Sequence, residues 1–210
     1  MYINFQRDWE ESLMSELRLE KLKVHHLGPI DLVVHASEIV CVSGKSGAGK
    51  SLLLRSIADL IPHAGKVYLD GRSSLEYTAP QWRKQVALLP AESQWWRDSV
   101  ASHFKTTDKQ TFESLGLSDE ALHWQVSRCS TGEKQRLAIL RLLANKPKCL
   151  LLDEPTGSLD PENTKRVEKL IKQIVDSEKI PVIWVSHSEE QIERIADRHV
   201  IVRDGGVFES

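Results

Sequence analysis

Long hydrophobic runs are missing from this chain of 210 residues. No apolar stretch approaches the ~20 residues that a helix needs to span a bilayer. The start of the chain, from Met1 to Asp8, lacks the basic and then apolar order of an export signal. We therefore expect a soluble, cytoplasmic protein.

A strong charge of one sign is also missing. The chain has 28 basic and 30 acidic residues, so its formal net charge is -2. A near-neutral chain has no broad field that would attract DNA, RNA or an anionic membrane, and we expect no nucleic-acid partner.

Cysteine is scarce. The three residues Cys41, Cys129 and Cys149 are odd in number and follow no metal-ligand spacing, and two of them lie inside apolar runs. We expect reduced and mostly buried thiols, as in cytosolic proteins, and neither a disulfide framework nor a zinc site.

What the chain does contain is a mixed pattern of strands and helices. Apolar residues make up 40% of the sequence, enough for one domain, which we place at residues 17–210 after an N-terminal extension at 1–16. Alternating apolar positions from Leu17 to Val34 predict a small antiparallel β subdomain. Buried strands that alternate with helices further along predict an α/β fold with a mainly parallel core sheet. A polar stretch at about 91–131 predicts a short helical subdomain.

Several elements have specific boundaries. A helix is expected at Leu52 to Leu60 because Pro62 bars its extension, and a turn is expected at Asp70-Gly71. Downstream, the predicted strands are Val86 to Leu89, Cys149 to Leu152 and Val182 to Val185, and the predicted helices are 132–145, 161–177 and 188–196.

A glycine-rich motif follows the apolar run Ile39 to Val42. It fits the phosphate-binding pattern G-x-x-x-x-G-K-[ST] and consists of Gly44, Lys45, Ser46, Gly47, Ala48, Gly49, Lys50 and Ser51. The glycines allow positive φ, so that successive N–H groups converge on phosphate oxygens, and the helix that follows adds its positive end. Lys50 would neutralise the β and γ phosphates, and Ser51 would bind magnesium. The motif predicts a nucleoside triphosphate site.

Two acids end a second buried strand. Asp153 and Glu154 directly follow Cys149 to Leu152, and ligands in α/β sheets bind at the carboxyl ends of strands. Asp153 would hold magnesium through a water, and Glu154 would accept a proton from an attacking water. The alternative is that these carboxylates only cap the next helix.

A hydroxyl and a glycine open the predicted helix at 132–145. The segment Ser130-Thr131-Gly132-Glu133 suits a capping motif, in which Ser130 or Thr131 is the N-cap. It also suits an anion site, because free N–H groups at a helix start can receive a phosphate from another molecule. Both interpretations stay open at this point.

Taken together, the motifs GKSGAGKS, STGEKQR, LLLDEPTGSLD and WVSH resemble the ATP-binding cassette family of P-loop ATPases over nearly the whole chain. The resemblance implies a RecA-like core and ATP with Mg²⁺ as ligands. It also implies a head-to-tail homodimer, in which Ser130 and Gly132 of one copy contact the γ phosphate bound by the other. Asp160 would communicate across the interface, and His187 would contact the γ phosphate and position the attacking water. The implied catalytic residues are therefore Lys50, Glu154 and His187.

The resemblance further implies a partner. In this family, ATP closes the dimer and hydrolysis opens it, which drives an integral membrane permease; such a subunit lies peripherally on the inner face of the cell membrane. Trp95 and Trp96 fall where the permease would dock. The chain looks most like small bacterial subunits of the metal (iron) export type. The alternative is a soluble ATPase of the same family that acts as a mechanical switch on DNA or ribosomes.

Three positions depart from the family pattern. Ala91 stands where the family usually has glutamine, and Glu92 or Gln94 would replace it only in part. Thr131 stands where glycine is usual, and its branched side chain would weaken the site in trans. An aromatic residue for the adenine base is missing; His25 or His26 would offer a flat ring there, and the alternative, which we favour, is that both are solvated loop residues.

Overall fold

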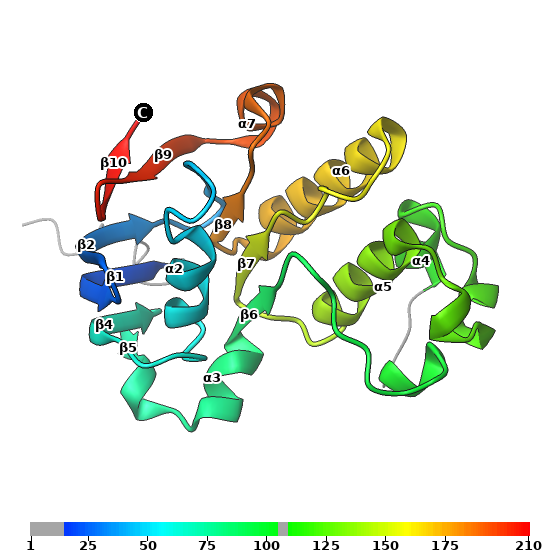
Figure 1. The fold of residues 1–210 in the computed structure, drawn as a ribbon. Coiled ribbons are helices and arrows are strands. Elements are labelled where there is room, and N and C mark those ends of the chain that lie inside the picture. Colours follow the sequence, from blue (N-terminus) through cyan, green and yellow to red (C-terminus); the bar gives the residue numbers. More distant parts are fainter. Residues whose placement is uncertain (1–14, 105–108) are drawn as a thin grey trace, which may run out of the picture.

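The centre of the molecule is a six-stranded sheet with the order β10-β9-β3-β8-β7-β6 (Figure 1). The computed structural model describes residues 15–104 and 109–210. The strands β9, β3, β8, β7 and β6 run parallel, and β10 pairs antiparallel with β9. The predicted mainly parallel core is therefore confirmed. The bounds are β3 Ile39–Ser43, β6 Val86–Leu89, β7 Cys149–Asp153, β8 Val182–Val185, β9 Arg198–Arg203 and β10 Gly206–Glu209.

A second, antiparallel sheet packs beside the first and has the order β2-β1-β4-β5. Its strands are β1 Leu17–Val24, β2 Leu27–Val34, β4 Ala64–Leu69 and β5 Arg72–Ser73. Asp70 and Gly71 join β4 to β5 with φ of 54° and 72°, as a tight two-residue hairpin turn requires. Both the antiparallel β layer and its Asp-Gly turn were predicted from the sequence, and both are confirmed.

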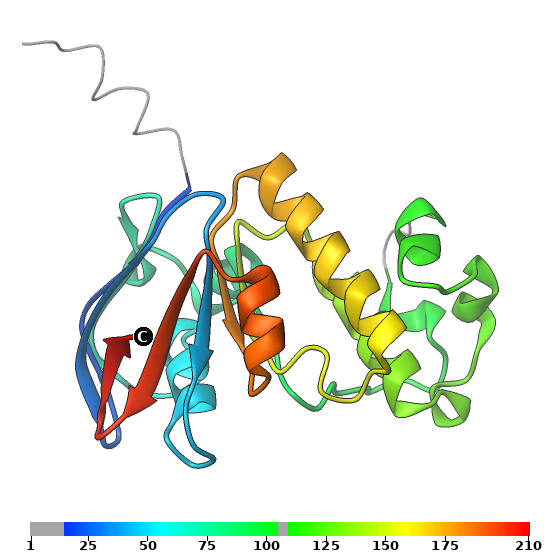
Figure 2. The same ribbon diagram turned by 90° about the horizontal axis from the view of Figure 1, so that it is seen from above.

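Two apolar cores lie on opposite faces of the parallel sheet. Side chains alternate along each strand, so Val40 and Val42 of β3 join one core while Ile39 and Cys41 join the other. The antiparallel sheet and helix α2 (Lys50–Ile57) cover the first face. Helices α5 (Thr131–Leu143), α6 (Pro161–Glu178) and α7 (Glu189–Ile195) cover the second (Figure 2).

The three cysteines are free and buried, as expected. Burial raises the pKa of the Cys41 thiol to about 12, and the nearby carboxylates Asp197 and Glu168 act in the same direction. Burial likewise raises the pKa of Cys129 and of Cys149. These side chains are part of the apolar cores.

The segment between β6 and α5 is built mainly from short helical turns. Its one α-helix in the described part is α4 (Lys109–Ser114), and 3₁₀ turns include Asp119–His123 and Val126–Arg128. Figure 1 shows this segment at the end of the molecule opposite the antiparallel sheet. The domain limits at 16/17 and at about 91–131 stay predictions, and residues 1–14 of the proposed extension lie outside the described residues.

One helix prediction had the wrong end, and one helix was missed. Helix α2 ends at Ile57 and not at Leu60, because Asp59 adopts a φ of 53° and the indole N–H of Trp82 donates to the Ile57 carbonyl at 2.9 Å. Pro62 therefore plays no part in ending it. Helix α3 (Ala79–Gln85) was not predicted, although Thr78 and Gln81 form a capping box at its start.

In the part of the chain that the structure describes, no helix has the length and apolarity needed to cross a membrane.

Candidate functional site

The predicted site segments leave the parallel sheet at one edge. Val42 of β3 pairs with Val185 of β8, and Val185 also pairs with Asp153 of β7. All three strands run in the same direction, so the loops that follow them start side by side. The structure therefore brings Lys50, Glu154 and His187 to one place.

The loop between β3 and α2 depends on its glycines. Gly44, Gly47 and Gly49 have φ of 143°, 78° and 104°, a region that side chains rarely adopt. A Cβ at Gly44 would lie 2.4 Å from the Val202 carbonyl oxygen, and one at Gly49 would lie 2.5 Å from a methyl of Leu27. Only glycine fits at these two positions, and the resulting backbone curl precedes the first turn of α2.

The Lys50 ammonium lies underneath this loop. Its side chain is buried, and Nζ donates to the carbonyl oxygens of Gly44 at 2.8 Å and Lys45 at 3.1 Å. Burial lowers the pKa of Lys50, while the nearby carboxylates Glu154 and Asp153 oppose that shift. The Lys50 ammonium is partly desolvated, and its hydrogen bonds go to neutral carbonyls. Such a cation favours the binding of an anion beside it.

Ser51 and Asp153 form the predicted cation position. Asp153 is only 4% exposed, and this burial raises the pKa of its carboxyl. A hydrogen bond from the Ser51 side chain and the positive charges of Arg55 and Lys50 oppose that rise. A hydroxyl and a carboxylate are oxygen ligands that suit Mg²⁺. Among residues 15–104 and 109–210, no group of three or more His, Cys, Asp or Glu could hold a metal ion. A cation here would thus take its other ligands from phosphate and water.

We expect Asp153→Asn to stabilise the nucleotide-free protein while removing its response to Mg²⁺. The pKa of the Asp153 carboxyl is higher in the folded than in the unfolded state. The protonated carboxyl therefore contributes stability below the unfolded pKa, and this contribution is lost as the pH rises through the folded pKa. At pH 7 the buried charge therefore destabilises the fold. The neutral amide should raise Tm by about 2–4 °C without ligand, and Mg²⁺ with nucleotide should add little further. A fall in Tm at pH 7 in thermal melts would contradict this.

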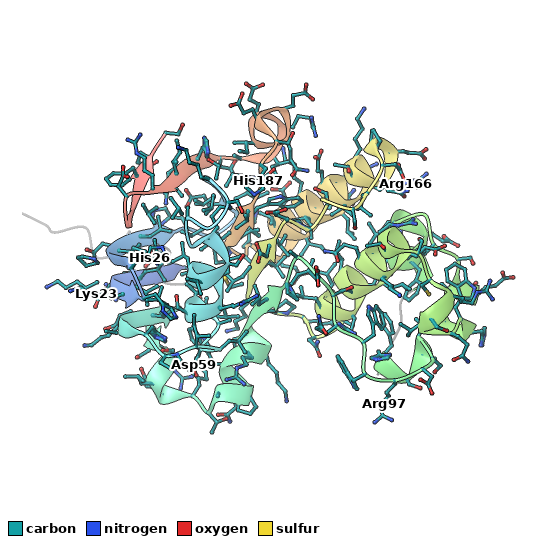
Figure 3. The ribbon with its side chains drawn as sticks, viewed as in Figure 1. Lys23, His26, Asp59, Arg97, Arg166 and His187 are labelled. Atoms are coloured by element: carbon teal, nitrogen blue, oxygen red, sulfur yellow. The ribbon has the colours of Figure 1, made fainter. Side chains whose placement is uncertain are left out.

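Glu154 and His187 are in direct contact. The Glu154 carboxylate lies 2.8 Å from Nε2 of His187, and both side chains are partly exposed. Glu154 has a φ of 49°, a strained conformation that turns the chain sharply after β7. The pair lines a cavity of about 670 Å³, together with Thr156, Gly157 and Gln191. Figure 3 shows His187 in the loop before α7, near the middle of the molecule.

Ser130 caps helix α5. Its backbone N–H and hydroxyl donate to the Glu133 carboxylate at 2.8 and 2.9 Å, and the Glu133 N–H donates back to its hydroxyl oxygen at 3.2 Å. The capping interpretation is therefore confirmed. These hydrogen bonds from Ser130 lower the pKa of Glu133. Ser130 and Thr131 are also exposed, so the helix start remains accessible to another molecule.

Within one chain, the Ser130 segment does not complete the phosphate loop. Figure 1 shows α2 and α5 on opposite sides of β6 and β7. Gly132 instead packs against the loop before α6: a Cβ there would lie 3.3 Å from a Leu159 methyl and 3.4 Å from the Ser158 oxygen. Asp160 in that loop caps α6 by accepting from the N–H of Asn163 at 2.9 Å. The roles of Ser130, Gly132 and Asp160 in a partner copy's site stay predictions.

Sequence reasoning missed two residues that hold this region together. Asn163 donates to Asp160 at 2.6 Å and accepts from Arg136 at 3.0 Å, and Arg136 also donates to the Leu115 carbonyl at 2.8 Å. They tie α6, α5 and the helical segment to one another. An arginine six residues after the N-cap of a helix is an ordinary surface position, so the sequence held no signal for this contact.

The departures from the family pattern lie in separate parts of the fold. Ala91 is exposed and lies two residues beyond Leu89, which pairs with Leu152 beside Asp153. The side-chain amide of Gln94 donates to the Glu92 carbonyl at 3.4 Å. His25 and His26 are exposed in the turn before Leu27, whose side chain packs on Gly49 at the start of α2. Whether these residues replace the family's glutamine and aromatic residue stays a prediction.

The fold and the site define a P-loop nucleotide-binding domain. A protein-family model described as ABC transporter matches residues 27–157. The methionine import ATP-binding protein MetN 1 of Oceanobacillus iheyensis is 33% identical, over 95% of this chain and 64% of that protein. The aliphatic sulfonates import ATP-binding protein SsuB 2 of Frankia alni is 33% identical, over 87% of this chain and 73% of that protein. The chain belongs to the ABC transporter family, and the predictions of an ABC-type ATPase domain and of ATP as its nucleotide are confirmed at that level.

Solved structures agree with the fold. A bacterial Atm1-family ABC exporter with ATP bound has a TM-score of 0.82 at 20% identity, over 94% of this chain and 39% of that chain. A dimeric ATP-binding cassette in a post-hydrolysis state with ADP and Pi has a TM-score of 0.78 at 22% identity, over 91% and 96% of the two chains. The two relatives above have import in their names, and resemblance to the iron export type stays a prediction.

Proposed function

We propose that this chain hydrolyses ATP as a subunit of an ABC transporter, forms a head-to-tail dimer, and drives a separate membrane permease from the cytoplasmic face. The observation that carries the proposal is the gathering of Lys50, the Ser51–Asp153 pair and the Glu154–His187 contact at one sheet edge. The names of the relatives, which are ATP-binding subunits of importers, support the same conclusion.

Each residue has a distinct task in this mechanism. The Lys50 ammonium leaves the Gly44 and Lys45 carbonyls to neutralise the β and γ phosphates. Glu154 accepts the proton of the attacking water, and His187, held against that carboxylate, orients the water toward the γ phosphate. Ser51 and Asp153 would hold Mg²⁺, which supplies positive charge to the transferred phosphoryl group.

The single chain does not bring the start of α5 to its own phosphate loop. The start of α5, with exposed Ser130 and Thr131, lies away from α2 in the same chain. A second copy in head-to-tail arrangement would place that helix start against the γ phosphate, where its N–H groups and positive end stabilise negative charge. This supports a dimer in which each site takes Lys50 from one copy and Ser130 from the other.

The proposed permease contact lies on the helical segment. Trp96 is 67% exposed, and the Arg141 guanidinium lies 4.4 Å from the Trp95 ring centroid and 4.8 Å from that of Trp96. His103 contacts both rings edge-on and accepts the backbone N–H of Trp96 at 3.2 Å. Arg97, next in the chain, lies at the outer edge of the helical segment, far from His187 (Figure 3). A rigid exposed aromatic of this kind is typical of interface hot spots.

We expect Trp96→Ala to weaken association with the permease by about 30-fold, the change for a hot spot of ~2 kcal/mol. Nucleotide affinity should stay unchanged, because this surface lies away from the P-loop. Leu75→Ala is a matched control, since Leu75 is 83% exposed on another part of the molecule. Pull-down with the permease and nucleotide titration would measure the two quantities. Loss of nucleotide binding, or equal weakening by Leu75→Ala, would contradict the assignment.

The proposed function is tested by Mg²⁺-dependent ATP hydrolysis together with co-purification. We expect the purified chain to hydrolyse ATP, to co-purify with a polytopic membrane protein, and to turn over faster with that partner in vesicles. Stimulation by DNA or ribosomes, with no membrane partner, would favour the alternative of a soluble mechanical ATPase. Absence of ATP hydrolysis under every condition would contradict both.

A further inference from the structure

A buried amide lies directly behind the Glu154–His187 pair. The side chain of Gln191, near the start of α7, is buried together with Thr156, Ser186 and Glu168. The three partners of Gln191 belong to three other segments: Thr156 to the loop after β7, Ser186 to the loop after β8 and Glu168 to α6. Gln191 and these three partners make up half of the eight buried polar or charged residues in the described chain.

All hydrogen-bonding capacity of this amide is used. Its Oε1 accepts from the Ser186 hydroxyl at 2.8 Å and the Trp184 indole N–H at 3.3 Å. Its Nε2 donates to the Thr156 hydroxyl at 2.9 Å and to the Glu168 carboxylate at 2.8 Å. The reversed amide would set its NH₂ against the Trp184 donor and its oxygen against the Glu168 carboxylate, so the partners permit one orientation only.

An ion pair fixes the far end of the network. Arg194 donates to both oxygens of Glu168, from Nη2 at 2.8 Å and from Nε at 3.2 Å. Glu168 is buried, so its carboxylate needs these partners and in turn holds the Gln191 amide in place. The position of the amide is therefore set by contacts within the protein, from Glu168 of α6 and Arg194 of α7.

The amide spans the two loops that carry the catalytic pair. Ser186 directly precedes His187, and Thr156 lies two residues after Glu154. We infer that Gln191 is a positioning residue for ATP hydrolysis: it holds these two loops in register, so that Nε2 of His187 meets the Glu154 carboxylate. Gln191 touches no substrate atom and acts through His187. The inference rests on the proposed function.

The test is a set of double-variant comparisons on Mg²⁺-ATP hydrolysis. Gln191→Met keeps length and helix propensity but removes the amide, and Thr156→Val removes only one hydroxyl. We expect each to lower kcat about 10-fold or more, because misplacement by about 1 Å costs on the order of 10²-fold. KM should change less than about 2-fold. Glu193→Gln, on the exposed face of the same helix, is the matched control and should leave kcat unchanged.

The distinguishing readout is the His187→Ala background. If Gln191 acts through His187, neither Gln191→Met nor Thr156→Val should lower kcat further once the imidazole is gone. Equal fold losses in both backgrounds, or an unchanged kcat in either folded variant, would overturn the inference. Should Gln191→Met fail to fold, Thr156→Val decides the question alone. Retention of full turnover by Glu154→Gln and His187→Ala would instead overturn the proposed function, and this inference with it.

Discussion

Glu154→Gln is expected to lower kcat for ATP hydrolysis by about 10²–10⁴-fold, the range for loss of a general base. The amide has nearly the shape of the carboxylate but cannot take the proton of the attacking water. Because Lys50 and the Ser51–Asp153 pair are untouched, nucleotide affinity should remain within about 3-fold of the wild type. Single-turnover hydrolysis and equilibrium titration with a fluorescent ATP analogue would measure the two quantities.

A control for this prediction is available in the same cavity. Glu190 lies near His187, is exposed, and loses the same charge when changed to glutamine. Glu190→Gln should keep wild-type turnover, because the contact with His187 is made by Glu154. If both variants lose activity equally, turnover depends on the total negative charge of the cavity, and Glu154 is not the general base. An unaffected Glu154→Gln enzyme would also reject the assignment.

Lys50→Met is expected to weaken Mg²⁺-ATP binding by about 10- to 150-fold, since hydrogen bonds from a charged group contribute about 1.5–3 kcal/mol. The ammonium is partly desolvated, and it donates to two carbonyls of the loop that it would leave. The thioether cannot neutralise the phosphates. Isothermal titration with ATP would give the affinity.

Lys45→Met removes an equal charge from the same loop and serves as the control. Its side chain is exposed, whereas that of Lys50 is buried, so it should change ATP affinity by less than about 3-fold. Similar losses in both variants would show that the loop responds to total charge alone, which would contradict a specific role for Lys50. Circular dichroism would confirm that each variant retains its fold.

The residues that could be predicted from the sequence are those whose backbone chemistry is local. Gly44, Gly47 and Gly49 were predicted as sites of positive φ because they lie between a buried strand and a helix, and each has positive φ. The order of buried strands also predicted that Asp153 and Glu154 would lie beside the phosphate loop. Parallel strands share one carboxyl edge, so a motif at the end of each strand is enough to place them together.

Other contacts could not be predicted because they depend on tertiary packing. The premature end of α2 arises from an indole of Trp82, 25 residues away in sequence, and only packing brings the two together. The Glu154–His187 distance and the Gln191 network arise in the same way, from loops of different strands. Gln191 and Thr156 lie in polar stretches of sequence, which favour exposure to solvent, and only the register of the sheet places their side chains in the interior.

The interpretation of Ser130 shows where local rules leave two answers. Ser130 and Glu133 predicted a capping box, and the structure contains it. The same helix start is also predicted to bind a phosphate in a partner copy's site. Ser130 is exposed, and its hydroxyl would be able to donate to a phosphate after its hydrogen bond to the Glu133 carboxylate breaks.

The central claim is that two copies of this chain enclose ATP between Lys50 of one and Ser130 of the other. Its most direct test is the molar mass of Glu154→Gln in light scattering, with and without Mg²⁺-ATP. We predict a shift from one chain to two on saturation with Mg²⁺-ATP, and no shift when Ser130→Arg is added. A variant that binds Mg²⁺-ATP to saturation and stays monomeric, even with its permease present, would contradict the account.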